Sequence, residues 1–249
     1  MIKVKNICKH FETTNGKELL FNNLSFEVPN GQFLSILGPN GCGKSTLFNL
    51  ITGVDSNYAG KIIINSNSNP IHKSVSYMLQ NDLLLPWLPV IDNIIIGGTI
   101  QGMSKAELIE KSNYYLNLLK IEHLKNKYPT NLSGGERQKV ALIRTIILGT
   151  EILLLDEPFS AIDYNTRLEL QATIYKYAEE NNTTVILVSH DIDEAIAVSD
   201  RIIILGAKPN GIILDISIEL EIKNRNPVTA RQHSEFAKYF KTVWENYPR

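Results

Sequence analysis

The glycine-rich stretch at residues 38–45, Gly-Pro-Asn-Gly-Cys-Gly-Lys-Ser, constrains the fold of this chain more than any other segment. It follows the apolar run Phe33–Leu37, which has the length of a buried strand, and it leads into Lys44–Thr52, where apolar residues recur at helical spacing. In a strand, glycine loop and helix of this kind, backbone N–H groups converge on phosphate oxygens at the positive end of the helix. The pattern therefore predicts an α/β fold with a phosphate-binding loop.

The loop pattern predicts a role for each of its residues. Three glycines allow the backbone to approach a phosphate: Gly38, Gly41 and Gly43. Lys44 is expected to reach the β and γ phosphates, in a catalytic as well as a binding role, and Ser45 is expected to ligate Mg²⁺. The remaining residues predicted to line the nucleotide site are Pro39, Asn40, Cys42 and Thr46. We assign no redox role to Cys42.

Polar residues follow two further apolar runs. Asp156 and Glu157 follow Ile152–Leu155, and His190 follows Val185–Val188 with one residue between. Ligands of open α/β sheets bind at the carboxyl ends of the strands, so these residues are expected to face the phosphate loop. Asp156 is predicted to hold Mg²⁺, and Glu157 to polarise a water for attack on the γ-phosphate. His190 would either donate to the γ-phosphate or orient Glu157 and the water.

Apolar runs predict the rest of a mostly parallel sheet with crossover helices: Lys61–Ile64, Ser74–Met78 and Ile202–Leu205. Three runs are predicted to form a smaller antiparallel layer: Ile2–Val4, Leu24–Val28 and Ile212–Ile216. The turn-rich segment Ile64–Pro70 is expected to be a surface loop.

A helical block interrupts this α/β pattern. Residues of about 83–150 are predicted to be an inserted helical subdomain, with helices over Ser104–Leu119 and Gly135–Leu148 and a capping box between Ser104 and Glu107. Residues of about 1–82 and 151–228 would form the α/β core. The tail, about 229–249, is expected to be a C-terminal helix that packs the aromatic face of Thr229–Glu245 on the core, all within a single domain of 1–249.

Composition excludes several classes of protein. The 249 residues carry a net charge of −1, which gives no general electrostatic argument for nucleic-acid binding. Two cysteines are too few for a disulfide framework and favour a reducing compartment. No signal-peptide core or run of about 18–20 apolar residues is found, so we expect the chain not to span a membrane.

Residues 132–138, Leu-Ser-Gly-Gly-Glu-Arg-Gln, predict a second anion-contacting surface. Small residues at a helix N-terminus expose N–H groups and a positive dipole end. The alternative is an ordinary glycine-containing helix start. Together with the other motifs, in their order along the chain, this segment makes the sequence resemble the nucleotide-binding subunits of ATP-binding cassette (ABC) transporters. The motifs that carry the resemblance are Gly38–Thr46, Gln80, Leu132–Gln138, Leu155–Pro158, Ser160–Asp163 and His190.

The resemblance implies a P-loop NTPase (RecA-like) fold, ATP and Mg²⁺ as cofactors, and ATP hydrolysis. It also implies a head-to-tail dimer with a second copy of the chain, which sandwiches two ATP molecules. In such a dimer the residues across the interface that contact nucleotide are Ser133, Gly134, Gly135 and Asp163. Gln80 would sense the γ-phosphate and Mg²⁺ and link the helical subdomain to the core. Phe11 would stack on adenine, although Phe21 is nearby and both phenylalanines are equally compatible with core packing.

The segments Asn81–Trp87 and Ile91–Ile94 resemble the ATPases of nitrate, sulfonate and taurine importers. This resemblance implies transmembrane permease subunits as partners, an extracytoplasmic solute-binding protein as an indirect partner, no nucleic acid, and a peripheral place at the cytoplasmic face of the cell membrane. Leu83–Trp87 would border the groove for a permease helix, with core packing of Trp87 as the alternative.

Two other classes remain to be weighed. A soluble ABC-type ATPase that is not coupled to transport, such as one in iron–sulfur cluster assembly, is the alternative function. A phosphate-loop kinase or GTPase is disfavoured because the chain has no Asn-Lys-x-Asp motif, and because that class would leave Ser133–Glu136 unexplained.

Overall fold

The computed structural model describes residues 1–13, 16–64, 74–160, 162–209, 211–222 and 225–248. A six-stranded sheet has the order β5-β6-β7-β3-β8-β9. Its strands are β3 (Phe33–Leu37), β5 (Val75–Met78), β6 (Ile152–Asp156), β7 (Thr184–Val188), β8 (Arg201–Leu205) and β9 (Ile212–Ser217). All neighbours pair in parallel except β8 and β9. The mostly parallel sheet predicted from the sequence is confirmed.

A second, antiparallel sheet has the order β2-β1-β4 and contains β1 (Ile2–Thr13), β2 (Gly16–Val28) and β4 (Ala59–Ile64). Two strand assignments were wrong. Lys61–Ile64 pairs with β1 in this smaller sheet, and Ile212–Ile216 forms the edge of the larger one. A short connection returns β9 alongside β8, so the pair is antiparallel. Apolar content identifies a strand but not its sheet. The loop predicted at Ile64–Pro70 lies, beyond Ile64, outside the described residues.

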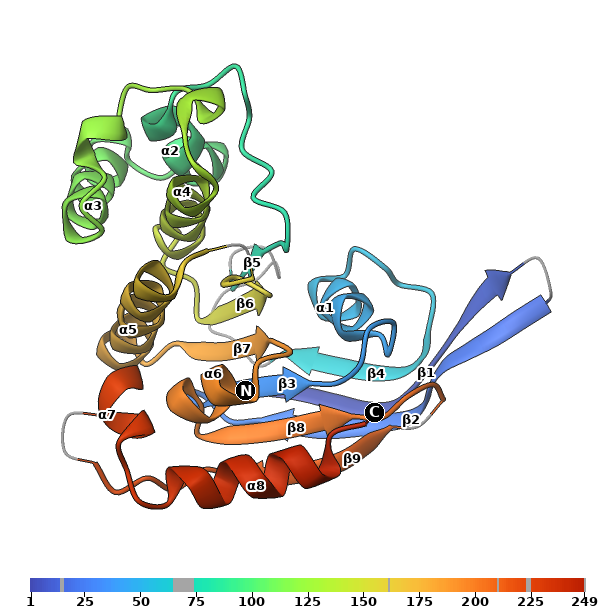
Figure 1. The fold of residues 1–249 in the computed structure, drawn as a ribbon. Coiled ribbons are helices and arrows are strands. Elements are labelled where there is room, and N and C mark those ends of the chain that lie inside the picture. Colours follow the sequence, from blue (N-terminus) through green and yellow to red (C-terminus); the bar gives the residue numbers. More distant parts are fainter. Residues whose placement is uncertain (14–15, 65–73, 161, 210, 223–224, 249) are drawn as a thin grey trace.

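Helices α2 (Val90–Ile100), α3 (Lys105–Leu118) and α4 (Gly134–Ile146) form the upper lobe in Figure 1, with the short 3₁₀ turns η2 (Glu122–Leu124) and η3 (Pro129–Asn131) between α3 and α4. The two predicted helices of this block are confirmed, and α2 is additional. The predicted capping box between Ser104 and Glu107 was wrong: Ser104 is the N-cap of α3, but its side chain makes no capping hydrogen bond.

The remaining helices are α1 (Lys44–Thr52), α5 (Tyr164–Asn181), α6 (Ile192–Val198), α7 (Pro227–Arg231) and α8 (Phe236–Asn246). The tail contains two helices where one was predicted. Its aromatic face packs on the core only in part: Phe236 and Val243 are buried, but Phe240 and Trp244 are exposed and stack on each other at 6.2 Å. Phe240 and Trp244 occupy a neighbouring stripe of α8 that turns away from the core.

Strand β3 passes between two hydrophobic cores. Phe33 and Leu37 belong to the core shared with the helical lobe, whereas Leu34 and Ile36 belong to the core beneath α1 and the antiparallel sheet. Burial on both faces accounts for the continuous apolar runs of β3, β6 and β7. Within the described residues, none of the helices has the length and apolar character needed to cross a bilayer.

Candidate active site

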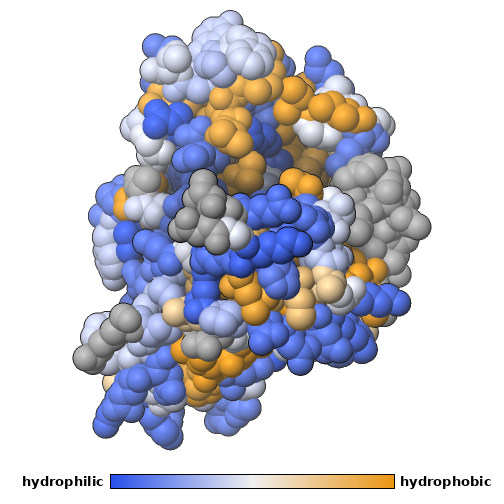
Figure 2. All heavy atoms as spheres, turned by 90° about the vertical axis from the view of Figure 1, so that its right-hand side faces the viewer, coloured by the Kyte–Doolittle hydropathy of each residue, from blue (hydrophilic) through white to orange (hydrophobic). Residues whose placement is uncertain are grey.

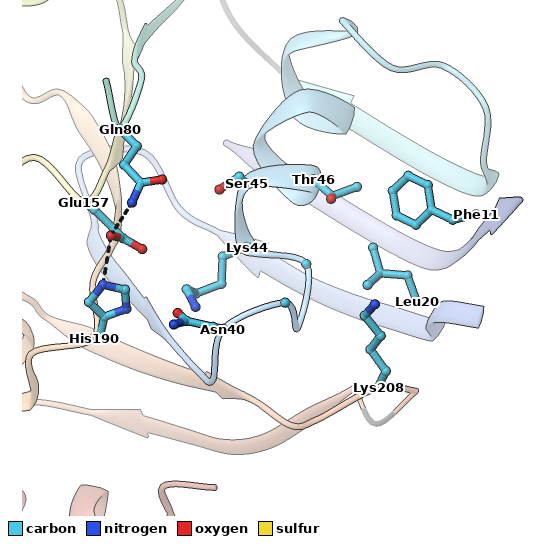
Figure 3. A pocket seen from close by; sticks show the side chains of 12 residues that line it. Phe11, Leu20, Asn40, Lys44, Ser45, Thr46, Gln80, Glu157, His190 and Lys208 are labelled. Carbon is cyan, nitrogen blue, oxygen red and sulfur yellow. Dashed lines mark hydrogen bonds and ion pairs between the residues drawn. The ribbon is translucent and has the colours of Figure 1, made fainter. Parts of the chain in front are cut away.

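A cleft of about 510 Å³ opens at the carboxyl ends of β3, β6 and β7. Figure 3 shows its lining residues, which come from segments far apart in the sequence. They are Phe11, Leu20, Asn40, Gly41, Gly43, Lys44, Ser45, Thr46, Gln80, Glu157, His190 and Lys208. The fold therefore brings most of the residues predicted for nucleotide binding and hydrolysis into one site. Of the other loop residues, Gly38 and Cys42 are buried and Pro39 is half-buried.

The loop between β3 and α1 has a backbone that glycine favours. Gly38, Gly41 and Gly43 have φ angles of +152°, +78° and +106°. A Cβ on Gly43 would lie 2.6 Å from the ring of Phe21, which is itself buried. Phe21 is therefore a core residue that packs behind the loop. Burial also raises the pKa of the Cys42 thiol.

Lys44 is buried at the base of the cleft. Its Nζ donates to the carbonyl oxygens of Gly38 at 2.8 Å and Pro39 at 3.0 Å. These contacts hold the ammonium group inside the curve of the loop, where an anionic ligand would meet it. Figure 3 shows its side chain beside Asn40 and below Ser45.

Asp156 ends β6 and is buried, and its carboxylate fits a magnesium site. Tyr77 donates to Oδ2 at 3.3 Å, whereas Oδ1 has no hydrogen-bond partner among the described residues although it is inaccessible to solvent. Burial raises the pKa of this carboxyl, and hydrogen bonds from Ser45 and Tyr77 oppose that shift. The unpaired Asp156 carboxylate oxygen and the Ser45 hydroxyl are oxygen ligands of the kind that bind Mg²⁺ together with nucleotide phosphates. Ser45 and Asp156 would hold the ion.

Glu157 follows Asp156 with a left-handed backbone, φ +49°. This conformation costs a non-glycine residue about 1–3 kcal/mol, and such strain concentrates at functional sites. The Glu157 N–H donates to Val188 O at 3.0 Å, which anchors the backbone to β7. Two side chains donate to Glu157 Oε2: Gln80 Nε2 at 2.8 Å and His190 Nε2 at 2.8 Å. The carboxylate is therefore held in one orientation at the mouth of the cleft.

A buried acid supports the segment that carries His190. Ser189 Oγ donates to Glu194 Oε2 at 2.7 Å, and the Asp191 N–H donates to Ser189 Oγ at 3.0 Å. Glu194 lies on α6 with its Oε1 3.6 Å from Arg167 Nε. Burial raises the pKa of Glu194 to about 7. The two residues that flank His190, Ser189 and Asp191, are thus both held by hydrogen bonds.

The far end of the cleft holds the aromatic candidate and two residues that sequence patterns missed. Phe11 lines the cleft at 39% exposure, and Lys9 Nζ lies 5.2 Å from its ring centroid. Leu20 and Lys208 lie beside it in Figure 3. Lys208 is paired with Glu18 at 3.1 Å. Neither Leu20 nor Lys208 stands in a motif, so only the tertiary fold reveals their position.

Ser133, Gly134 and Gly135 lie elsewhere, and none of them is among the described residues that line the cleft. Ser133 and Gly134 are exposed at the start of α4. Ser133 Oγ accepts from the Glu136 N–H at 3.3 Å, and the Ser133 N–H donates to Glu136 Oε2 at 2.7 Å, which forms a capping box. The hydrogen bonds lower the pKa of Glu136.

Asp163 caps the neighbouring helix α5. Its Oδ1 accepts from the N–H groups of Asn165 and Thr166, both at 3.1 Å. The two helix starts are adjacent, because a Cβ on Gly135 would lie 3.6 Å from Ile162. We call Ser133–Gly135 and Asp163 the helix-start half of the site. The cleft residues of the phosphate loop with Gln80, Asp156, Glu157 and His190 are the strand-edge half.

Polar contacts connect the two halves within one chain. Arg137 Nε is paired with Asp82 Oδ2 at 3.0 Å, and Asp82 follows Gln80 by two residues. Gln138 Nε2 donates to Pro158 O at 2.6 Å, directly after Glu157. Helix α4 is therefore bonded to the segment that follows Gln80 and to the segment that follows Glu157.

The cassette geometry agrees with comparisons to known proteins. A family model described as "ABC transporter" matches residues 21–160. The chain belongs to the ABC transporter family. It is 33% identical to the aliphatic sulfonates import ATP-binding protein SsuB of Bacillus cereus, over 99% of this chain and 95% of that protein. It is 34% identical to the nitrate transport protein NasD of Klebsiella oxytoca, over 95% of this chain and 92% of that protein.

Among solved structures, the chain resembles a dimeric, post-hydrolysis state of the ATP-binding cassette MJ0796 bound to ADP and Pi. The TM-score is 0.78 at 27% identity, over 88% of this chain and 99% of that one. The chain is an ABC ATPase cassette that uses ATP with Mg²⁺. The predicted family, fold class and enzyme class are confirmed.

Proposed function

We propose that this ABC cassette powers an importer by ATP-driven dimerisation, and that each ATP is held between the strand-edge half of one copy and the helix-start half of the other. The observation that carries the proposal is the separation of the two halves within one chain. Ser133–Gly135 lie outside the cleft that contains Lys44 and Glu157. Ser133 and Gly134 are exposed there, and the N–H groups of Gly134 and Gly135 at the start of α4 would meet an anion presented by a second molecule.

The strand-edge half suits in-line hydrolysis of ATP. Lys44 and the loop amides bind phosphate oxygens, and Mg²⁺ held by Ser45 and Asp156 would neutralise phosphate charge. Glu157, held by Gln80 and His190 through Oε2, accepts a hydrogen bond from the attacking water and orients it. Phe11 stacks on adenine at the other end of the cleft, where Leu20 and Lys208 add an apolar and a cationic contact.

Substitution of Glu157 tests the dimer. We expect Glu157→Gln to retain ATP binding, because the phosphates are held by the loop, and to lower turnover by at least about 100-fold, because an amide cannot take the proton of the water. Light scattering with ATP and Mg²⁺ should then show a stable dimer. Glu180→Gln, on the exposed face of α5, is the control and should hydrolyse ATP normally. A Glu157→Gln protein that stays monomeric at saturating ATP contradicts the sandwich.

The importer assignment rests on the relatives and on an apolar surface of the helical lobe. The sulfonate import protein and the nitrate transport protein named above match this chain over 99% and 95% of its residues. Figure 2 shows apolar side chains at the surface of the upper lobe, above a hydrophilic band. Leu83 and Trp87 are 56% and 67% exposed, so core packing does not explain them, whereas Leu84 is buried. We propose that the exposed pair meets a permease subunit, which would place the cassette at the cytoplasmic face of the membrane.

Affinity purification from detergent-solubilised membranes separates an importer from a soluble ATPase. A multi-spanning membrane protein should co-purify with the wild type and be depleted with the Leu83→Ser/Trp87→Ser double variant, whose ATP binding should remain intact. Recovery of only soluble partners would favour the alternative ATPase that is not coupled to transport.

A further inference from the structure

Tyr77 connects the edge strand β5 to the carboxylate that ends β6. Its hydroxyl donates to Asp156 Oδ2, with an oxygen–oxygen distance of 3.3 Å. Asp156 is only 2% exposed, and its Oδ1 has no hydrogen-bond partner among the described residues. The two oxygens of this buried carboxylate therefore differ, because the tyrosine bonds one of them and the other is left unpaired.

The register of two strands places the hydroxyl at this carboxylate. Tyr77 pairs with Leu154 in the parallel ladder of β5 and β6, so their side chains lie on the same face of the sheet. Asp156 stands two residues after Leu154 and shares that face. The long tyrosine side chain passes Leu154 and meets Asp156 at the carboxyl end of β6. A register slip of one residue would turn the hydroxyl to the opposite face.

Helix α1 covers this face of the sheet and fixes the tyrosine ring, and Figure 1 shows it beside β5 and β6. The rings of Tyr77 and Phe48 meet edge-on, with centroids 5.5 Å apart and an interplanar angle of 87°. Phe48 is fully buried and stands three residues after Ser45, on the same side of α1. Ser45 is itself a hydrogen-bond partner of Asp156. The tyrosine thus packs between α1 and the sheet beside both predicted ligands of the ion.

We propose that Tyr77 is a positioning residue that orients the Asp156 carboxylate so that Oδ1 is presented to Mg²⁺. The inference rests on the proposed function, in which Ser45 and Asp156 hold the ion. The terminal torsion of an aspartate has broad, roughly two-fold preferences, so a carboxylate without such a partner can exchange its two oxygens. The Tyr77 hydroxyl prevents that exchange by bonding Oδ2. Loss of a partner that orients a metal ligand typically lowers metal affinity about 10- to 100-fold.

Replacing Tyr77 by phenylalanine removes the donor and keeps the ring that packs against Phe48. If the hydroxyl only satisfied a buried oxygen, its loss would lower stability and leave the affinity for the ion unchanged. If it orients the carboxylate, its loss lowers the affinity for the ion. Nucleotide binding without the ion persists in either case, because Lys44 and the loop amides are intact. Metal affinity therefore separates the two roles.

Titration of Mn²⁺ into the chain saturated with a non-hydrolysable ATP analogue tests the inference, with the free ion followed by electron paramagnetic resonance. We expect the half-saturating Mn²⁺ concentration to rise about 10-fold in Tyr77→Phe. Affinity for the analogue in EDTA should stay within about 2-fold of wild type. Equal Mn²⁺ affinities of wild type and Tyr77→Phe overturn the inference, as does an equal loss of affinity for the analogue in EDTA.

Tyr177→Phe is the matched control for loss of a buried tyrosine hydroxyl. The Tyr177 hydroxyl donates to Ile146 O at 3.1 Å, and Tyr177 is not among the described residues that line the cleft. Both variants should lose similar stability in urea unfolding, because each loses one hydrogen bond. Only Tyr77→Phe should bind Mn²⁺ more weakly. An equal loss of Mn²⁺ affinity in both variants overturns the inference.

A double-mutant cycle with Asp156→Asn shows whether the hydroxyl acts through this carboxylate. Ser45 and the phosphates remain as ligands, so Mn²⁺ binding stays measurable, and adding Tyr77→Phe should cause no further loss. A further loss of about 3-fold or more in that background overturns the inference. If the wild-type complex binds Mn²⁺ no more tightly than the analogue alone, the proposed metal site fails and the inference fails with it. If the wild type binds the ion and Tyr77→Phe matches it, the inference alone fails.

Discussion

The two halves of the proposed composite site are built in different ways. The strand-edge half stands at the ends of β3, β6 and β7, whose residues are wholly buried. The helix-start half is built around two N-caps, Ser133 and Asp163, both exposed. The first half is positioned by the backbone ladders of a sheet, and the second by side-chain hydrogen bonds to helix N–H groups.

This difference indicates which half is suited to catalysis and which to contact with a second copy. A ladder of buried strands fixes catalytic atoms closely, as the shared contacts of Gln80 and His190 to Glu157 require. An N-cap bonds some of the first-turn N–H groups, and those that it does not bond lie at the helix start, clear of the core. The helix-start half is therefore suited to a ligand from outside the chain, and it can be altered without damage to the cleft.

The largest expected effect is that of Ser133→Arg. ATP affinity of the single chain should stay within about 2-fold of wild type, because Ser133 lies outside the cleft. Steady-state ATPase activity should fall at least about 100-fold, because the arginine blocks approach of the second copy and removes a phosphate contact. Fluorescent-nucleotide titration and phosphate release measure the two quantities.

A control is needed because Ser133 also caps α4, and loss of a cap costs about 1 kcal/mol of folding free energy. Asn226→Ala removes a similar capping box from α7, away from the cleft. It should lose comparable stability in urea unfolding but retain its ATPase activity. Normal turnover in Ser133→Arg would contradict the assignment of the helix-start half.

The same contrast explains what the sequence could and could not predict. The buried strands that end at Asp156 and two residues before His190 are recognisable because both the apolar run and the polar residue after it are local features. Helix capping was harder to predict from the sequence. Ser104 and Ser133 each stand three residues before a glutamate, yet of these two only Ser133 forms a capping box. Which sheet β4 and β9 join depends on long-range pairing. Tyr247 stands in no motif, and the hydrogen bond from its hydroxyl to Gly38 O depends on where α8 packs.

The second prediction concerns Glu194, the buried acid beneath the His190 loop. Its pKa rises from 4.5 to about 7 on folding, chiefly because of burial. A folded-state pKa above the unfolded value means that the native state binds more protons between pH 4.5 and 7. Stability therefore decreases as the pH rises through that window, by up to about 3 kcal/mol.

Glu194→Gln should remove this dependence while its amide oxygen still accepts from Ser189 Oγ. Urea unfolding between pH 5 and pH 8 is expected to show a smaller loss of stability in the variant than in the wild type. The exposed Glu180→Gln variant should follow the wild-type curve. Identical pH slopes for Glu194→Gln and wild type would show that this carboxyl does not set the stability of the strand-edge half.

The smallest expected effect tests the connection between the halves. Arg137 in the first turn of α4 is paired with Asp82 and also donates to Leu132 O at 3.0 Å, next to Ser133. The pair is partly exposed, so its loss should change stability by only about 1 kcal/mol or less. If it transmits the state of Gln80 to the helix-start half, Arg137→Ala should lower turnover about 3-fold with ATP affinity unchanged.

Lys139→Ala is the matched control, because Lys139 lies on the same helix and pairs with Glu169 at 2.6 Å, on the side of α5. Its turnover should remain near that of wild type. Asp82→Asn should reproduce the effect of Arg137→Ala, and the double variant should be no slower than either single one, since both act through one contact. Additive losses would mean that each residue acts separately. The two halves would then communicate through the buried bond from Gln138 to Pro158, where the helix-start half meets the core beside Glu157.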